Sequence, residues 1–371
     1  MKINYKEILC LLVIIIFSLL NIKKGYLLNK RYITFFNKQI IWITISLVIY
    51  FFIYKINFKK IYKLKYIIYI FNIFLLIYVL IFSKSINNTK AWINIFGLSF
   101  QPSELIKITY PIISINYFKH NKYLIPTILF LIPFTLILLE PDTGNAILLL
   151  LIFIYLLKNK NNKKIINIFI AISIMSIFIF ILIFKYKSSL IINLFDGKLY
   201  YRFKRIIDFK NNYQINNALI GIGNAKLFPI PLNRLIIYIP EGLTDFMFSF
   251  HICNFGIVFS IFLILIYMLF TYQIIKKYLN ERYIYHKKLI GAFLTVFISQ
   301  EIYNILMNIG LMPIMGIPLP FFSYGGSNII TYFIFYSLVN KKISSIEDKD
   351  NNNYKNNYHK VQMGIHSYFH N

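Results

Sequence analysis

The sequence has few acidic residues and few charged residues of any kind. Only 13 of its 371 residues are Asp or Glu, and charged residues make up 14% of the chain against 58% hydrophobic residues. A water-soluble domain of this size needs a more polar surface, so the composition excludes one and predicts a polytopic membrane protein. Cysteine is also scarce, because Cys10 and Cys253 are too few for a disulfide framework. No internal repeat is evident, which argues against an inverted-repeat transporter.

Basic residues, by contrast, are in excess. The 40 Lys and Arg residues give a formal net charge of +27, which invites a nucleic-acid interpretation. The lysines flank apolar runs and do not form one contiguous basic face, so we expect no nucleic-acid partner. Lys, Asn, Ile, Tyr and Phe are abundant together, a pattern that suggests an AT-rich bacterial genome.

Apolar runs approaching the roughly 20 residues that a membrane-spanning helix needs recur along the chain. The first run lacks a small-residue cleavage site, so we interpret it as an uncleaved span and not as a signal peptide. The predicted fold class is all-α, with ten transmembrane helices at about 7–22, 39–57, 66–83, 103–118, 123–139, 143–157, 165–185, 246–272, 289–311 and 324–340.

This division predicts two regions of unequal size. Residues 1–340 would form the membrane domain, with a large periplasmic loop at about 186–245 between the seventh and eighth helices. Residues 341–371 are polar and rich in Asn, which is typical of a disordered tail.

The distribution of lysine predicts the orientation, because short cytoplasmic loops carry most of the Lys and Arg. With the N-terminus inside, every inner loop is basic, whereas the outer loops 140–144 and 311–327 contain no Lys or Arg. The first outer loop breaks the rule with Lys23, Lys24 and three further basic residues. We predict that both termini are cytoplasmic and that the protein lies in the bacterial inner membrane.

The unusual polar segments then fall on the outer, periplasmic side. They are residues 92–107, 140–144, 186–245 and 316–327. Ionisable groups and irregular backbone are tolerated at membrane depth only where they are paired, buried or line a cavity. The four segments therefore predict one external site.

The stretch "MGIPLPFFSYGGSN" at 315–328 is the most irregular of these segments, with two prolines and three glycines. We interpret it as a re-entrant segment that forms a wall of the site. Its hydroxyl and backbone N–H groups would contact sugar or phosphate, and they belong to Ser323, Tyr324, Gly325, Gly326 and Ser327.

Four motifs carry a resemblance to a known family: "FQPSELIKI" at 100–108, "EPDTGNA" at 140–146, "PEGLTDFMF" at 240–248 and "GIPLPFFSYGGS" at 316–327. In order and spacing they resemble the signatures of the SEDS family (shape, elongation, division and sporulation). The resemblance covers roughly residues 5–340. It implies a ten-span bacterial glycosyltransferase that polymerises peptidoglycan from lipid II.

The resemblance also implies partners and a branch of the family. The partners would be a class B penicillin-binding protein, which is the transpeptidase, and other membrane proteins of the elongation complex. The short termini and the segment 313–327 resemble the RodA-like elongation branch more than the FtsW-like division branch. Glu140, where RodA-like proteins more often have Gln, leans the other way.

The implied reaction needs a base. The 4-hydroxyl of one lipid-linked sugar attacks the anomeric carbon of another, and a neutral hydroxyl needs a carboxylate within hydrogen-bond reach. Asp245 lies at the outer mouth of the eighth span, and the resemblance places the family's essential aspartate there. The alternative is that Asp245 only favours the helix N-terminus electrostatically, with Thr244 as the N-cap.

Other charged residues form pairs or lie near the expected substrate. Glu104 and Lys107 are three residues apart and share a helix face, so we predict a buried ion pair that shapes the cavity. The alternative is an interfacial pair with a snorkelling lysine. Arg205 could hold a diphosphate with its guanidinium group, and the resemblance aligns it with a family arginine; the alternative is a solvated loop charge.

Asp142 supports two interpretations of equal weight, a turn residue in "PDTG" or a substrate contact. With Glu140 it forms a weak candidate site for a divalent cation, Mg²⁺ or Mn²⁺. Two other classes of function also stay open. A lipid II flippase would need polar residues through the whole bundle, and a scaffold would carry vestigial enzymatic groups.

Overall fold

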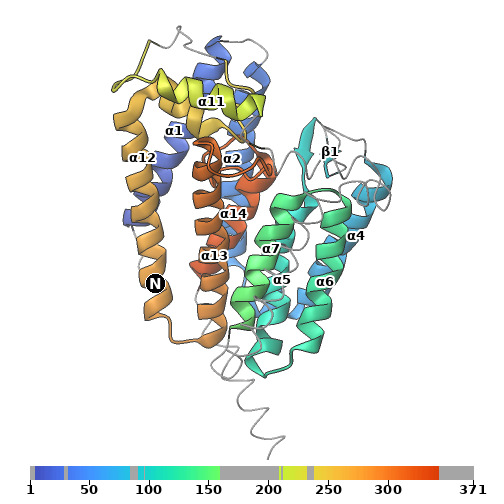
Figure 1. Cartoon of the computed structure of the whole chain (residues 1–371). Helices are drawn as coiled ribbons and strands as arrows, with labels where there is room; N and C mark the ends of the chain where they lie inside the picture. Colours follow the sequence, from blue (N-terminus) through green and yellow to red (C-terminus); the bar gives the residue numbers. More distant parts are fainter. Residues whose placement is uncertain are drawn as a thin grey trace, which may run out of the picture.

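The computed structural model describes residues 5–28, 32–83, 91–95, 97–158, 209, 212–231 and 238–341. These residues form a bundle of long, roughly parallel and antiparallel helices (Figure 1). The helices are α1 (Tyr5–Leu28), α2 (Ile33–Lys55), α3 (Phe58–Lys63), α4 (Lys65–Phe82), α5 (Pro102–Lys119), α6 (Leu124–Leu139), α7 (Thr143–Leu157), α11 (Tyr213–Gly223), α12 (Met247–Asn280), α13 (Ile284–Asn308) and α14 (Gly326–Val339).

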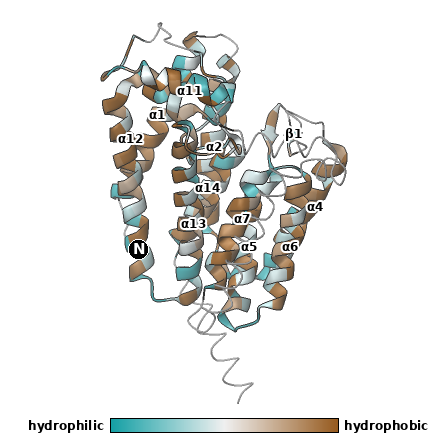
Figure 2. Cartoon of the chain, in the orientation of Figure 1, coloured by the Kyte–Doolittle hydropathy of each residue, from teal (hydrophilic) through white to brown (hydrophobic). Residues whose placement is uncertain are grey.

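Five of the described helices, α1, α2, α4, α12 and α13, are long and apolar enough to cross a membrane, and α6, α7 and α14 are shorter apolar helices. The fold class predicted from the sequence, a polytopic helical membrane protein, is therefore confirmed. Each predicted span within the described residues coincides with a helix, whereas the seventh span, 165–185, lies outside them. Hydrophobic residues predominate along the long helices (Figure 2), and many of their large apolar side chains are exposed.

The helices extend beyond the apolar runs that predicted them. α1 continues to Leu28, although its predicted span ends at residue 22, and α12 continues to Asn280. A helix can continue beyond the lipid, where its residues need not be apolar. A span predicted from apolar composition therefore underestimates the length of the helix.

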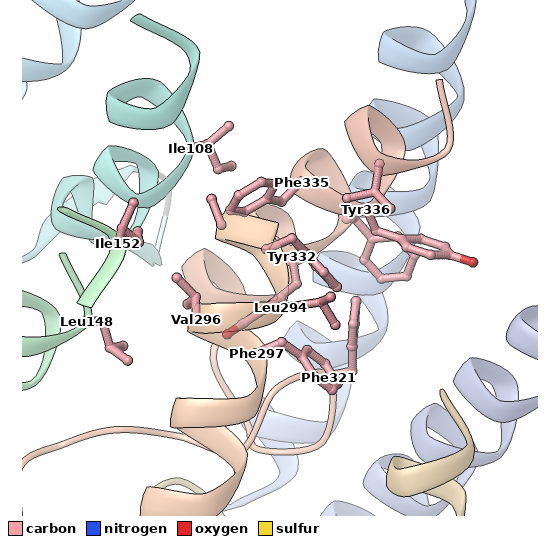
Figure 3. Close-up of a cluster of buried hydrophobic side chains, with 14 of the residues drawn as sticks. Ile108, Leu148, Ile152, Leu294, Val296, Phe297, Phe321, Tyr332, Phe335 and Tyr336 are labelled. Atoms are coloured by element: carbon pink, nitrogen blue, oxygen red, sulfur yellow. The ribbon is translucent and has the colours of Figure 1, made fainter. Parts of the chain in front are cut away.

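α1, α2, α12, α13 and α14 lie in one half of the bundle and α4, α5, α6 and α7 in the other (Figure 1). The halves meet where α5 and α7 pack on α13, and α5 also packs on α14. Figure 3 shows this contact, with Ile108 of α5, Ile152 of α7 and Phe297 of α13 among its buried side chains. The irregular segment before α14 adds Phe321 to the same cluster.

Contacts between distant segments show that α1 begins where α12 and α14 end. At one end of the bundle Glu7, near the start of α1, pairs with Lys277, near the end of α12. The Glu7 carboxylate also accepts a hydrogen bond of 2.9 Å from Tyr336, near the end of α14. The first and last described helices therefore begin and end on the same side, as the predicted topology requires.

The opposite end carries the four motif segments and two elements that the sequence did not predict. A two-stranded antiparallel hairpin, β1 (Ile93–Ile95) and β2 (Leu98–Phe100), precedes α5, and the 11-residue helix α11 lies across the bundle end near α1, α2 and α12 (Figure 1). This short hairpin is an addition to the helical fold that the sequence predicts. Gly97, with φ +78°, supplies a backbone conformation that other residues rarely adopt.

Candidate functional site

Asp245 lies in a turn at residues 240–246, directly before α12. Its backbone carbonyl accepts hydrogen bonds from two asparagines of α13, Asn304 at 2.9 Å and Asn308 at 3.0 Å. Asn308 is held in turn by Ser249, whose hydroxyl donates to its amide oxygen at 2.6 Å. These bonds fix the position of Asp245 without engaging its carboxylate.

Two further contacts hold the same turn. The backbone N–H of Tyr324 donates to the carbonyl of Leu243 at 2.9 Å. The Leu243 side chain packs on α1 at Gly25, where a Cβ atom would lie 2.8 Å from it. The turn that carries Asp245 is thus held by α1, by α13 and by the segment before α14.

The Asp245 side chain is half-buried, and no side chain of the described residues donates a hydrogen bond to its carboxylate. Burial, reinforced by the negative charges of Glu241 and Asp142, raises the pKa of Asp245 to about 7. A carboxyl group with a pKa near neutrality exchanges a proton readily at physiological pH.

The alternative role for Thr244 is wrong, because it does not cap α12. The N-cap residue is Phe246, which makes no side-chain capping bond. The Thr244 hydroxyl instead donates to the Glu241 carboxylate at 2.7 Å.

Asp142 is the N-cap of α7, where its carboxylate accepts the backbone N–H of Asn145 at 3.1 Å. The same carboxylate accepts from the side chains of Gln101 at 2.6 Å, Ser103 at 2.8 Å and Asn145 at 2.8 Å. The turn interpretation of Asp142 therefore holds, and four donors already occupy its oxygen atoms. Burial raises the pKa of Asp142, and these hydrogen bonds oppose the rise.

Gln101 joins three of the motif segments, and the sequence analysis did not single it out. Its side chain donates to Asp142 in the turn between α6 and α7, and its backbone N–H donates to the Ser327 hydroxyl of α14 at 2.7 Å. Gln101 directly precedes Pro102, the first residue of α5. A proline at that position is typical of a helix start, so the sequence could have indicated Gln101 as the residue that caps α5.

Glu140 is fully buried, and neither of its carboxylate oxygens has a hydrogen-bond partner. Burial, with a smaller contribution from Asp142, raises its pKa to about 9, so the side chain is protonated at neutral pH. The described residues contain no group of three or more His, Cys, Asp or Glu side chains that could hold a metal ion. A protonated Glu140 beside an occupied Asp142 does not fit a divalent-cation site.

Glu104 and Lys107 form an ion pair of 2.7 Å, with side chains only 4% and 1% exposed. Asn328 of α14 donates to the Glu104 carboxylate at 3.3 Å, and the Lys107 ammonium lies 5.9 Å from the centre of the Tyr332 ring. This pair joins α5 to α14 inside the bundle. A snorkelling lysine would be exposed, so the interfacial alternative is wrong.

The segment 313–325 has no regular secondary structure, and its residues 319–323 are buried. Ser323 accepts the backbone N–H of Leu319 at 2.9 Å, and Ser327 accepts that of Gln101. Both hydroxyls, predicted as substrate contacts, thus hold backbone. Tyr324 stacks on Phe35 of α2 with ring centres 4.3 Å apart.

Gly325 and Gly326, at the junction with α14, differ in their surroundings. A Cβ atom on Gly326 would overlap the Trp42 ring at 1.9 Å, so Gly326 is required for the close approach of α14 and α2. Gly325 has ample space, since an added Cβ atom would lie 3.9 Å from the Asn328 side chain. Of the five predicted contact residues, Tyr324 and Gly325 are the two that keep part of their surface exposed.

Polar side chains are not confined to this end, contrary to the sequence analysis. Glu7 and Lys277 pair at 2.5 Å at the opposite end, and Gln39 and Gln300 are buried within the bundle. Gln300 donates to the backbone carbonyl of Pro318 at 2.7 Å. These groups bond to neighbouring helices and segments, so they hold the bundle together.

The chain is similar to known proteins over most of its length. The sequence model of the FtsW, RodA and SpoVE family, described as a cell cycle protein, matches residues 2–347. The chain belongs to the SEDS family. A probable peptidoglycan glycosyltransferase FtsW from Wigglesworthia glossinidia brevipalpis is 31% identical over 88% of each chain. The peptidoglycan glycosyltransferase MrdB of Helicobacter pylori is 25% identical over 81% of each chain.

Solved structures share the SEDS fold at lower sequence identity. A chain from a peptidoglycan synthase complex that coordinates polymerization and crosslinking is 19% identical, with a TM-score of 0.76 over 91% of this chain and 97% of its own. The rod shape determining protein RodA of Thermus thermophilus is 21% identical, with a TM-score of 0.64 over 91% and 96%. At these identities the likeness concerns the fold.

Two further side chains near Asp245 have packing roles. Leu243 fills the contact with Gly25. The sulfur of Cys253 packs against Gly221 of α11. The neighbouring Asn254 carbonyl accepts hydrogen bonds from Ile230 and Lys24. Arg205, the predicted diphosphate contact, lies outside the described residues, as does the chain from residue 342 onwards.

Proposed function

We propose that this chain is a peptidoglycan glycosyltransferase that polymerises lipid II into glycan strands, with Asp245 as the general base. One observation carries the proposal: Asp245 is fixed through its backbone, while its carboxylate accepts no hydrogen bond from a side chain of the described residues and has a pKa raised to about 7 by burial. A structural aspartate shows the opposite arrangement, as Asp142 does with its four donors. The names of the relatives support the same reaction class.

The proposed step joins two lipid-linked sugars. The 4-hydroxyl oxygen of the acceptor bonds to the anomeric carbon of the donor, and the bond from that carbon to the diphosphate oxygen breaks. The hydroxyl proton passes to the Asp245 carboxylate as the oxygen attacks, and undecaprenyl diphosphate leaves. Such a base contributes typically about 10²–10⁴-fold to the rate.

Burial, together with the negative charges of Glu241 and Asp142, holds the pKa of Asp245 at about 7, whereas a solvated aspartate has a pKa of about 4. Arg205 is proposed to hold the diphosphate, in keeping with its guanidinium chemistry. Of the five predicted contact residues, Tyr324 and Gly325 keep surface for a sugar.

We place this site at the periplasmic face of the bacterial inner membrane. The support is the lysine distribution, which leaves the loops 140–144 and 311–327 without Lys or Arg. The proposed partner is a class B penicillin-binding protein, which would cross-link the strands. A chain of the same fold belongs to a complex that couples polymerization to crosslinking, and this supports the pairing.

Elongation and division are the two processes that such a polymer could serve. The segment 313–327 favours the RodA-like elongation branch, whereas the relative at 31% identity carries the division name FtsW. We propose elongation and test it by expressing the chain in bacteria depleted of RodA or of FtsW. Rescue of rod shape supports elongation, and rescue of division alone refutes it.

The function is tested with purified protein, lipid II and a class B penicillin-binding protein. The parent chain should make glycan strands, and Asp245→Asn, which keeps the shape of the side chain, should lose about 10²–10⁴-fold in rate. Glu241→Gln is the matched control, because it removes a carboxylate of the same turn whose recorded partner is Thr244. It should retain polymerisation.

Melting temperature in detergent separates loss of the base from loss of the fold. Both variants should melt within a few degrees of the parent, since neither side chain is fully buried. Normal strands made by Asp245→Asn would refute the catalytic assignment. Translocation of lipid II without strands, by the parent chain, would instead establish the flippase.

A further inference from the structure

Helix α12 is interrupted close to the site. Gly256 has φ +86° and ψ 170°, which lie outside the helical region, so its neighbours lose helical hydrogen bonds. Residues 247–256, before the break, are all buried. Exposed apolar side chains begin directly after it and continue down the helix: Ile257, Val258, Phe259, Ile261, Phe262, Leu265, Met268 and Leu269.

The length of α12 after the break matches the hydrocarbon core, with the break at its outer boundary in the predicted orientation. Residues 257–276 at about 1.5 Å per residue span roughly 30 Å, the thickness of that core. Lys276 and Lys277 then lie at its inner boundary. The buried part of α12 before Gly256 accordingly rises above the lipid, towards Asp245.

The segment after α11 fills the break in α12. The carbonyl of Lys226 accepts the N–H of Ile257 at 3.0 Å, and that of Leu227 accepts the N–H of Val258 at 3.2 Å. A Cβ atom on Gly256 would lie 2.6 Å from the Leu227 carbonyl oxygen. Only glycine permits this approach, and its positive φ provides the bend.

Part of the backbone of this segment is bonded within the fold. Pro229 and Pro231 have no N–H group, and the N–H of Ile230 donates to the Asn254 carbonyl at 3.1 Å. The Ile230 carbonyl accepts from the buried ammonium of Lys24 at 3.2 Å. The N–H groups of Leu227 and Phe228 have no partner among the described residues, so their backbone belongs at the level of the hydrated headgroups, and only their side chains can reach the acyl chains.

Two apolar side chains of this segment point away from the protein. Leu227 is 61% exposed and Phe228 is 63% exposed. Their backbone bonds to α12 at the level where its lipid-facing surface begins, so the two apolar surfaces are continuous. Lys226, also exposed, precedes them with a charge that suits phosphate headgroups.

We propose that Leu227 and Phe228 form a wedge that inserts into the acyl chains of the outer membrane leaflet beside α12. The wedge anchors the end of the bundle that carries Asp245 at a fixed height above the bilayer. Lys24 and Gly256 are its positioning residues, since they bond to or accommodate its backbone. The proposal does not depend on the glycosyltransferase function.

A depth measurement tests the wedge. Phe228→Cys is labelled with a thiol-reactive nitrobenzoxadiazole dye and reconstituted in vesicles of phosphatidylethanolamine and phosphatidylglycerol, with or without lipids that carry a doxyl group at acyl carbon 5. Cys10 and Cys253 are buried, so the parent chain gives the background. Asn224→Cys, exposed three residues before Leu227, is the matched control.

We expect the label at position 228 to emit at shorter wavelength than that at 224, to be quenched by doxyl lipid and to be protected from aqueous iodide. Leu227→Cys should behave like Phe228→Cys, and melting temperatures show that each variant is folded. Equal emission and equal iodide quenching at 224 and 228 would overturn the proposal. Protection at 228 that appears only after a class B penicillin-binding protein is added would assign the surface to a protein partner and overturn it equally.

Discussion

The substitution Lys107→Met removes the ammonium that lies 2.7 Å from the Glu104 carboxylate and keeps most of the side-chain volume. The carboxylate then stays inside the bundle with one remaining recorded donor, Asn328 at 3.3 Å. Removal of one partner of a buried ion pair costs about 3–5 kcal/mol. With side chains 4% and 1% exposed, water cannot replace the lost partner.

The matched variants separate charge from packing. In Glu104→Gln the amide oxygen still accepts from Lys107, so the variant loses the attraction between the two charges but keeps the hydrogen bond, and it should lose less stability than Lys107→Met. The double variant Glu104→Gln/Lys107→Met leaves no buried charge. Because neutral replacements of buried pairs are often harmless, it should be more stable than Lys107→Met alone.

Denaturation in mixed detergent micelles, followed by circular dichroism, measures the three variants against the parent. We expect Lys107→Met to be the least stable of the four proteins. A Lys107→Met protein as stable as the parent would show that the pair contributes nothing to the fold. A double variant no better than Lys107→Met would show that lost packing, and not a stranded carboxylate, causes the damage.

Four further predictions follow from individual contacts. Polymerisation should rise as the pH increases through about 7, because the Asp245 base acts when deprotonated; in Glu241→Gln this rise should move to lower pH by part of the displacement, since burial remains, and an unmoved profile contradicts the assigned cause. Asn308→Ala should lower kcat per folded molecule and flatten this pH profile, because it removes one of the hydrogen bonds that hold the backbone of Asp245. The melting temperature gives the folded fraction, and an unchanged kcat per folded molecule would refute the positioning role. Glu140 holds its proton in the folded chain up to about pH 9, so its contribution to the free energy of unfolding should be fully present below about pH 4.5 and be lost as the pH rises to about 9. Glu140→Gln should remove the corresponding fall in melting temperature. Gly256→Ala should destabilise the chain by roughly 1–3 kcal/mol or more, because it combines a left-handed backbone with a 2.6 Å clash; an unchanged melting temperature would show that the break relaxes freely.

The membrane spans could be predicted from the sequence alone, because the bilayer imposes a local rule. Each membrane-spanning helix is a single continuous run of apolar residues, so it can be found in the sequence without knowing its periodicity or its tertiary contacts. The ranges 103–118 and 143–157 agree with α5 and α7 to within one residue. The positions of the motifs at one end follow from the same rule, since helices that alternate in direction fix the side of every loop.

The ion pair could also be predicted, because residues three apart on a helix are neighbours whatever surrounds them. Its burial agrees with the prediction, and the helix supplies both partners. The turn role of Asp142 was likewise visible in "PDTG". What Asp142 binds beyond its own turn was not, because Gln101 and Ser103 lie about 40 residues earlier in the chain.

Only the tertiary structure decided how the proposed base is held and how its pKa is set. Asn304 and Asn308 reach Asp245 across 59 and 63 residues of sequence, and the pKa depends on burial that many segments create together. The same holds for Lys24, which breaks the charge rule in the sequence and is a buried donor to Ile230 in the fold. A sequence pattern reports what a residue meets within one helical turn or one bilayer crossing. Desolvation and long-range hydrogen bonds depend on which distant segments pack together, and that information exists only once the chain has folded.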